Sequence, residues 1–240
     1  PAMKIVLGEI RPWTFRAICL AAGGAGLLAL ARAGGAALRV PAGDLKPLVI
    51  TSLINITGWH ILSAYGISML HAGRAAIIAY TMPMWAILLS RLILKERVTP
   101  MRLWALAFGF VGLFLLLWPD LQAVEAAPAG VLFMLGAAFC WAAGTVLGKY
   151  FQWHMPATPV MGWQLLLGGI PVVFGACLQE PLAAVAAISP NALLTLIFVV
   201  FLPIIFCHWA FFRVVQIFPA NVAALSTLCI PAIGVFSSAL

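Results

Sequence analysis

The chain of 240 residues is 65% hydrophobic and only 8% charged, whereas about 25% of the residues in a soluble domain carry a charge. This composition excludes a water-soluble fold and predicts an integral membrane protein whose main partner is the lipid bilayer. The net charge is +7, but the basic residues stand singly at the ends of apolar runs. That pattern is typical of membrane orientation signals and argues against nucleic-acid binding.

Charged residues, prolines and glycines divide the chain into eight apolar stretches. They lie at 12–30, 47–69, 73–94, 101–118, 129–148, 157–178, 191–213 and 219–240. Each is close to the roughly 20 residues that cross a hydrocarbon core about 30 Å thick. Lipid offers no hydrogen bonds to the backbone, and the stretches lack the alternation of barrel strands. The sequence therefore predicts an all-α fold, a polytopic membrane helix bundle.

The basic residues also predict the orientation of the bundle. If the first helix runs inward, nine of the 13 basic residues fall in the connections on one side: Arg32, Arg39, Lys46, Arg91, Lys95, Arg97, Arg102, Lys149 and Arg213. The positive-inside rule assigns that side to the cytoplasm. The expected localisation is the cell membrane, with multiple passes.

A shift of the chain on itself by 148 residues aligns His60 with His208 and Pro83 with Pro231. The sequence thus predicts two repeats, 1–118 and 119–240. On this interpretation the first repeat lacks its first helix and the second lacks its last, so the intact protein would have ten helices in two halves of five. An odd number of helices per half inverts the second half, an arrangement that places a transporter's binding site at the repeat interface.

Four segments also resemble a known family. They are the runs 73–85 (GRAAIIAYTMPMW), 94–99 (LKERVT), 141–149 and 219–231. In these segments the sequence is similar to the drug/metabolite transporter superfamily, and specifically to its EamA-type exporters. The resemblance implies ten helices with both ends cytoplasmic and export of amino acids, amines or toxic compounds. Other relatives carry nucleotide sugars or triose phosphates, which leaves such a carrier as an alternative.

Two histidines are the first candidates for a substrate-binding site. His60 and His208 each lie somewhat past the middle of an apolar stretch. Ionisable groups near the middle of a bilayer are costly and suggest function. The alternative is that each histidine only donates a hydrogen bond to a neighbouring helix.

Aromatic and amide side chains extend this list of substrate-binding candidates. Asn55 and Trp59 are four residues apart, hence on one face of an α-helix, and could hold a small polar or aromatic solute. Trp141 is a further aromatic candidate within a stretch. Interhelical packing is the alternative for Asn55 and Trp59.

Prolines within two stretches predict helix breaks. Each proline frees the carbonyl four residues before it, and such a carbonyl needs a partner or lines a polar cavity. We therefore expect Pro83 and Pro231 to act as hinges, with Tyr80 and Ser226 nearby as substrate-binding residues. A purely structural kink is the alternative.

The sequence offers no catalytic residues, no metal site and no cofactor motif. It has no phosphate-binding loop, and no Asp or Glu lies well inside a predicted helix. A polytopic membrane enzyme is the alternative from another functional class, but it would need such groups. The sequence predicts a secondary transporter that exports a small-molecule substrate, such as an amino acid or amine, by alternating access. It leaves open whether the carrier forms a homodimer.

Overall fold

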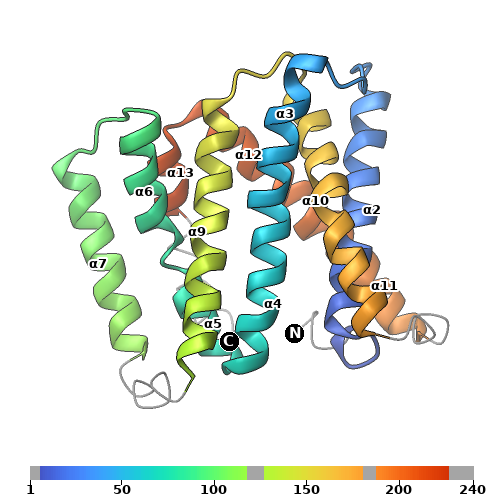
Figure 1. The fold of residues 1–240 in the computed structure, drawn as a ribbon, viewed down its shortest axis with the longest axis horizontal. Helices are drawn as coiled ribbons and strands as arrows, with labels where there is room; N and C mark the ends of the chain where they lie inside the picture. The colour runs from blue at the N-terminus through green and yellow to red at the C-terminus, as the bar shows by residue number, and fades with distance from the viewer. Residues whose placement is uncertain (1–5, 118–126, 181–187, 227–240) are drawn as a thin grey trace. The chain divides into compact units, whose positions relative to one another are not determined.

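The computed structural model describes residues 6–117, 127–180 and 188–226, and in these ranges every regular element is a helix (Figure 1). Six spans are long and apolar enough to cross a membrane: Pro12–Ala33, Ala42–Met69, Gly73–Ile93, Pro128–Tyr150, Ala157–Gln179 and Pro190–Ile217. The predicted all-α membrane bundle is confirmed. The stretch predicted at 101–118 is helix α7 (Pro100–Leu117), and of the stretch predicted at 219–240 the structure describes helix α13 (Ala220–Ser226).

The second span begins earlier than predicted. Helix α3 (Ala42–Thr51) starts five residues before the predicted boundary at 47 and contains Pro47. Pro47 is the sixth residue of this helix, so the N–H that it lacks leaves the carbonyl of Gly43 without its usual helical partner. Asp44 lies in the first turn of α3, where the helix dipole favours a negative charge.

Two spans contain a π-helical segment. Segment η1 (Ser52–Gly58) separates α3 from α4 (Trp59–Met69), and η4 (Val200–Cys207) separates α11 (Pro190–Val199) from α12 (His208–Ile217). The two segments begin 148 residues apart, at Ser52 and Val200, and the two 28-residue spans that contain them also begin and end 148 residues apart. The offset detected in the sequence therefore recurs in the backbone.

The helices group into two compact units. Unit 1 comprises Pro1–His60 and Gln152–Arg213, and unit 2 comprises Ile61–Phe151 and Val214–Leu240. Unit 1 contains α2 (Pro12–Ala33), α3, η1, α10 (Ala157–Gln179), α11 and η4. Unit 2 contains most of α4, with α5 (Ala72–Ala79), α6 (Met82–Ile93), α7, α9 (Pro128–Tyr150) and α13.

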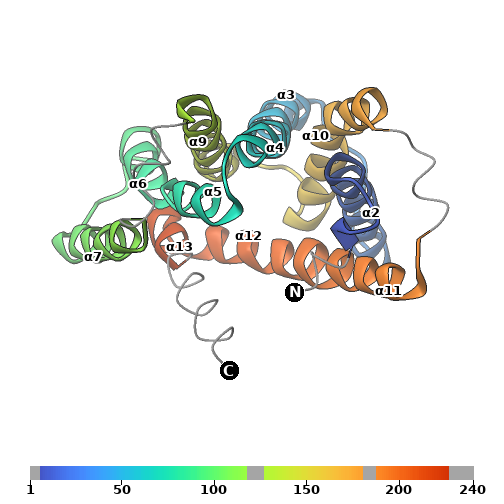
Figure 2. The same ribbon diagram turned by 90° about the horizontal axis from the view of Figure 1, so that it is seen from below.

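Glycines set the packing of unit 1. Helices α2 and α10 pack side by side, as Figures 1 and 2 both show. A Cβ on Gly24 would lie 3.0 Å from the carbonyl oxygen of Gly162, and a Cβ on Gly162 would lie 3.2 Å from that of Gly24. Helix α10 also meets η1, where a Cβ on Gly168 would lie 2.6 Å from the carbonyl oxygen of Ser52. Small residues that let backbones approach closely drive helix association in lipid.

Alanines have the same role in unit 2. Helix α6 packs against α9 and α13, and Ala86, Ala142 and Ala224 form a small buried cluster there. Trp85 and Leu89 pack against this cluster. Short side chains at the centre and larger ones at its edge bring the three helices close together.

Candidate functional site

The two histidines singled out in the sequence meet in unit 1. His60 is the second residue of α4 and His208 is the first residue of α12, so each follows a π-helical segment. Both side chains are partly buried, and they lie close enough to interact electrostatically. The ring of His208 also packs on Phe212, with 5.1 Å between ring centroids. Two spans related by the 148-residue offset thus bring equivalent residues together.

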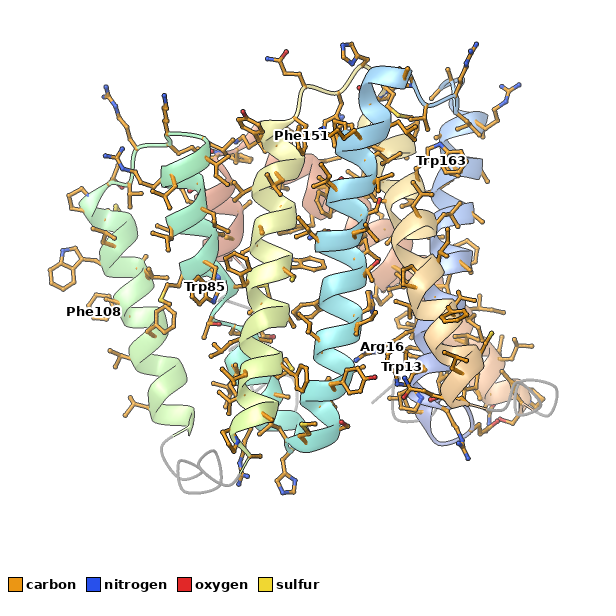
Figure 3. All side chains as sticks on the ribbon, viewed as in Figure 1. Trp13, Arg16, Trp85, Phe108, Phe151 and Trp163 are labelled. Carbon is orange, nitrogen blue, oxygen red and sulfur yellow. The ribbon has the colours of Figure 1, made fainter. Side chains whose placement is uncertain are left out.

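Arg16 joins these histidines. Its guanidinium donates a hydrogen bond from Nη1 to the backbone carbonyl of His60, and its charge acts on the His60 imidazole. Figure 3 shows Arg16 beside Trp13, which lies three residues earlier on α2. We call Arg16, His60 and His208 the basic cluster.

The sequence interpretation missed Arg16, because it assigned this residue to the outer end of the first helix. One signal was available. A proline in the first turn marks the start of a helix, and Pro12 places Arg16 five residues into an apolar span.

The acids of unit 1 serve other groups. Glu180 accepts hydrogen bonds from the backbone N–H groups of Trp13 (3.0 Å) and Thr14 (2.7 Å) and from the Thr14 hydroxyl (2.7 Å). It thereby caps the N-terminus of α2, whose own N-cap residue provides no side-chain cap. Asp44 is 1% exposed. Its carboxylate accepts a hydrogen bond from the backbone N–H of His154 (2.9 Å) and lies 2.7 Å from Nδ1 of the same histidine.

Glu9 supports a second helix start in unit 1. It accepts hydrogen bonds from the hydroxyl (2.6 Å) and the backbone N–H (2.7 Å) of Ser189. The Ser189 hydroxyl in turn accepts from the N–H of Ala192 and caps α11. The bonds from Ser189 lower the pKa of Glu9, the hydroxyl having the larger effect.

Glu96 has the corresponding role in unit 2. Its carboxylate accepts from the backbone N–H groups of Ala220 (3.0 Å) and Asn221 (3.4 Å) at the start of α13. It also pairs with Lys149 at the end of α9, 3.2 Å away. All four acids in the described ranges, Glu9, Asp44, Glu96 and Glu180, thus bind helix ends, turns or a basic partner. None of them pairs with Arg16.

Asn55 and Trp59 also lie in unit 1, but not on a regular α-helix. Asn55 belongs to η1 and is 1% exposed, whereas Trp59 begins α4 and is partly buried. A π-turn bonds residues five apart, so the four-residue spacing no longer shows that both side chains share a face. Nearby, the Thr57 hydroxyl donates to the carbonyl of Gly168 (2.7 Å) and ties η1 to α10.

The remaining predicted residues lie in unit 2. Tyr80 and Thr81 separate α5 from α6, and Pro83 is in the first turn of α6. The span is therefore broken where the proline predicted a break, and the Thr81 hydroxyl donates to the carbonyl of Ile78 (2.8 Å). Trp141 is partly buried in α9.

The second repeat's proline and serine can be placed only in part. Ser226 is the last described residue of α13, and its side chain is outside the described set. Pro231 lies outside the described residues altogether. Four of the predicted binding residues, Asn55, Trp59, His60 and His208, are thus gathered in unit 1, and Tyr80, Trp141 and Ser226 belong to unit 2.

Asn221 in unit 2 is a buried polar residue that the sequence interpretation did not consider. Asn221 is 0% exposed, and within the described structure neither polar atom of its side-chain amide has a hydrogen-bond partner. Buried polar atoms without partners are rare in folded proteins. A single asparagine among hydrophobic residues forms no motif, so the sequence offered no reason to single out Asn221.

Comparison with known proteins connects the chain to transporters. A family model described as the EamA-like transporter family matches residues 1–118 and 128–240. The "Uncharacterized transporter YoaV" of Bacillus subtilis is 24% identical over 236 residues, which cover 98% of this chain and 80% of YoaV. The "Probable amino-acid metabolite efflux pump" of Salmonella typhimurium is 23% identical over 175 residues, or 70% of this chain and 58% of the pump.

Two further comparisons concern a shorter sequence match and the fold. "Protein PecM" of Dickeya dadantii is 32% identical over 146 residues, or 59% of this chain and 48% of PecM. A solved crystal structure matches with a TM-score of 0.81 over 96% of this chain and 78% of its own. Its sequence identity is 19%, so this likeness bears on the fold alone.

Proposed function

The chain belongs to the EamA-like transporter family, and from this premise we propose that it exports a small metabolite, such as an amino acid or an amine, by alternating access. Family membership confirms the resemblance noted in the sequence. The protein is a multi-pass membrane transporter and not an enzyme. The relatives named as amino-acid metabolite efflux pumps support both the direction of transport and the substrate class.

The observation that carries the proposal is that His60 and His208, at equivalent places of two interrupted spans, lie close enough in unit 1 to interact electrostatically. Each lies within two residues of the end of a π-helical segment, and such segments occur frequently at functional sites. In many transporters the substrate site is formed by interrupted helices from two repeats. We propose that Asn55, Trp59, His60 and His208, all in unit 1, contact the substrate. Tyr80, Trp141 and Ser226 stay substrate-binding predictions from the sequence.

The repeats and hinges belong to the same proposal. The 148-residue offset between the two interrupted spans supports two inverted repeats, 1–118 and 119–240. The break between α5 and α6 supports a hinge at Pro83. The offset assigns the same role to Pro231.

The acids support facilitated diffusion over proton coupling. The carboxylates in the described part of the chain are all held by helix ends or basic partners, so none is available there as a proton carrier. We propose that the protein moves its substrate down the concentration gradient. Uphill export driven by an imposed pH gradient would contradict this.

A panel of labelled solutes tests the function. Cells that express the full-length protein are preloaded with labelled amino acids and amines, and solute loss is compared with that from cells carrying His60→Ala. His71→Ala is the matched control, because His71 is exposed and precedes α5. We expect faster loss of one solute class with the wild type and with His71→Ala, and loss at the background rate with His60→Ala. Absence of solute loss across the panel would contradict the proposed function.

A further inference from the structure

Arg16 has hydrogen-bonding capacity that the described structure does not use. A guanidinium carries five N–H donors, and the Arg16 side chain makes a single hydrogen bond there, from Nη1 to the carbonyl of His60. Arg16 is partly buried. It is thus a membrane-embedded cation with several N–H donors for which the described structure shows no acceptor.

Snorkelling does not explain this geometry. An arginine near the end of a membrane helix usually extends its head group to the interface. The Arg16 guanidinium instead bonds the backbone of His60, which lies nine residues before the end of its span at Met69, or about 14 Å along a helix axis. The charge is therefore directed toward the interior of the span.

The charge of Arg16 also has no anionic partner in the described structure. A cation within a membrane is costly unless it is paired. The four described acids bind other groups, and the other two members of the basic cluster are imidazoles, which carry no negative charge. A ligand with a carboxylate would supply the missing charge and could accept two parallel N–H bonds from the guanidinium.

We propose that Arg16 binds the carboxylate of the transported solute, so that the carrier selects amino acids and other monocarboxylates over the corresponding amines. The inference rests on the proposed transport function and decides between the two solute classes named there. Trp59 precedes His60, and its indole suits an apolar or aromatic side chain on the solute. The Trp13 ring instead packs against α10, where a Cβ on Gly175 would lie 2.8 Å from its Cζ3. A single guanidinium suits one carboxylate rather than a phosphate with several charges.

The test uses pairs of solutes that differ in the carboxylate alone. Purified full-length protein is reconstituted in liposomes, and transport of labelled L-phenylalanine is compared with that of phenethylamine, and L-leucine with isopentylamine. The variants are Arg16→Gln, which removes the positive charge, and Arg16→Lys, which keeps the charge but lacks the planar guanidinium that can bond both oxygens of a carboxylate. Arg32→Gln is the matched control, because it removes one charge from the exposed end of the same helix.

The expected result is a change in selectivity. Arg16→Gln should lower amino-acid transport at least about tenfold, as expected for loss of a charge-assisted hydrogen bond, and should lower amine transport less, so that the ratio of amino-acid to amine transport falls. Arg16→Lys should be intermediate, and Arg32→Gln should resemble the wild type. A monodisperse gel-filtration profile checks that each variant is folded.

Other outcomes overturn the inference without overturning the function. Equal loss of both solutes in Arg16→Gln, with a monodisperse gel-filtration profile, would make Arg16 a residue that only positions His60. An unchanged preference would also overturn it. If the wild type transports neither solute, the proposed function fails, and a binding measurement then tests the role of Arg16. The tryptophan fluorescence of the wild type should change on addition of L-phenylalanine but not of phenethylamine, and Arg16→Gln should show no change with either. Any other pattern of fluorescence change would overturn the inference.

Discussion

The side chain of Lys149 bonds both Glu96, at 3.2 Å, and the carbonyl of Phe218, at 2.6 Å. Glu96 also caps α13 through the N–H of Ala220. One ion pair therefore joins the end of α9, the turn after α6 and the start of α13. The two side chains are 25% and 14% exposed, so water screens the pair less than it would a surface pair.

Glu96→Gln should destabilise unit 2. The substitution removes the charge that binds Lys149 and weakens the cap of α13, which should cost about 1–2 kcal/mol. The melting temperature of detergent-purified protein, followed by fluorescence-detected gel filtration, measures the effect. Arg91→Gln, at an exposed position of α6, is the control and should melt like the wild type. Equal melting of Glu96→Gln and wild type would show that the pair adds no stability.

Gly168→Ala should destabilise unit 1 by about 1–3 kcal/mol. The added Cβ would lie 2.6 Å from the Ser52 carbonyl oxygen, so α10 must move away from η1. Gly112→Ala is the control. Gly112 lies in α7 with open space around its Cβ position, and alanine favours a helix by up to about 1 kcal/mol there. The melting temperature should fall for Gly168→Ala and rise for Gly112→Ala. An unchanged melting temperature for Gly168→Ala would contradict the close packing of α10 against η1.

Asn221→Leu should not lower stability. The amide of Asn221 is buried without partners in the described structure, so the native state bears its desolvation cost. An apolar group of similar volume removes that cost, which is about 1–3 kcal/mol for an unsatisfied group. An equal or higher melting temperature is expected. A clear decrease would show that the amide makes a stabilising bond in the membrane.

Glu9 should make stability depend on acid pH. Hydrogen bonds from Ser189 hold the pKa of Glu9 below its ordinary value of 4.5. A carboxylate whose pKa is lower in the folded state stabilises that state above the unfolded pKa, and the contribution is lost as pH falls through the folded pKa. Glu9→Gln should therefore melt below the wild type at pH 7. The difference should shrink in melting curves recorded as the pH falls below 4.5 and should vanish only below the lowered folded-state pKa. A difference that does not shrink with acid would have another cause.

The sequence predicted much of the architecture, because long apolar spans leave helices as the only structure that satisfies the backbone in lipid. It also identified His60 and His208 through their common offset, and a break near Pro83 through the missing N–H. The π-helical segments were not predicted, because residues such as Ser52–Gly58 have no pattern that separates a π-turn from an α-turn. The sequence also could not show that Arg16 bonds His60, 44 positions away, or that Glu180 caps a helix that begins 168 residues earlier. Such contacts depend on how helices pack and not on local spacing.

A double-mutant cycle between His60 and His208 tests the central claim most directly. Transport of the exported solute into proteoliposomes is measured for the wild type, His60→Ala, His208→Ala and the double variant. If both imidazoles contact one solute, each single variant should lower the transport rate at least about tenfold. The double variant should transport only slightly more slowly than the slower of the two single variants, because the effects of substituting residues that act together do not add. Strictly additive losses, or single variants that transport like the wild type, would show that the two histidines do not share a substrate site.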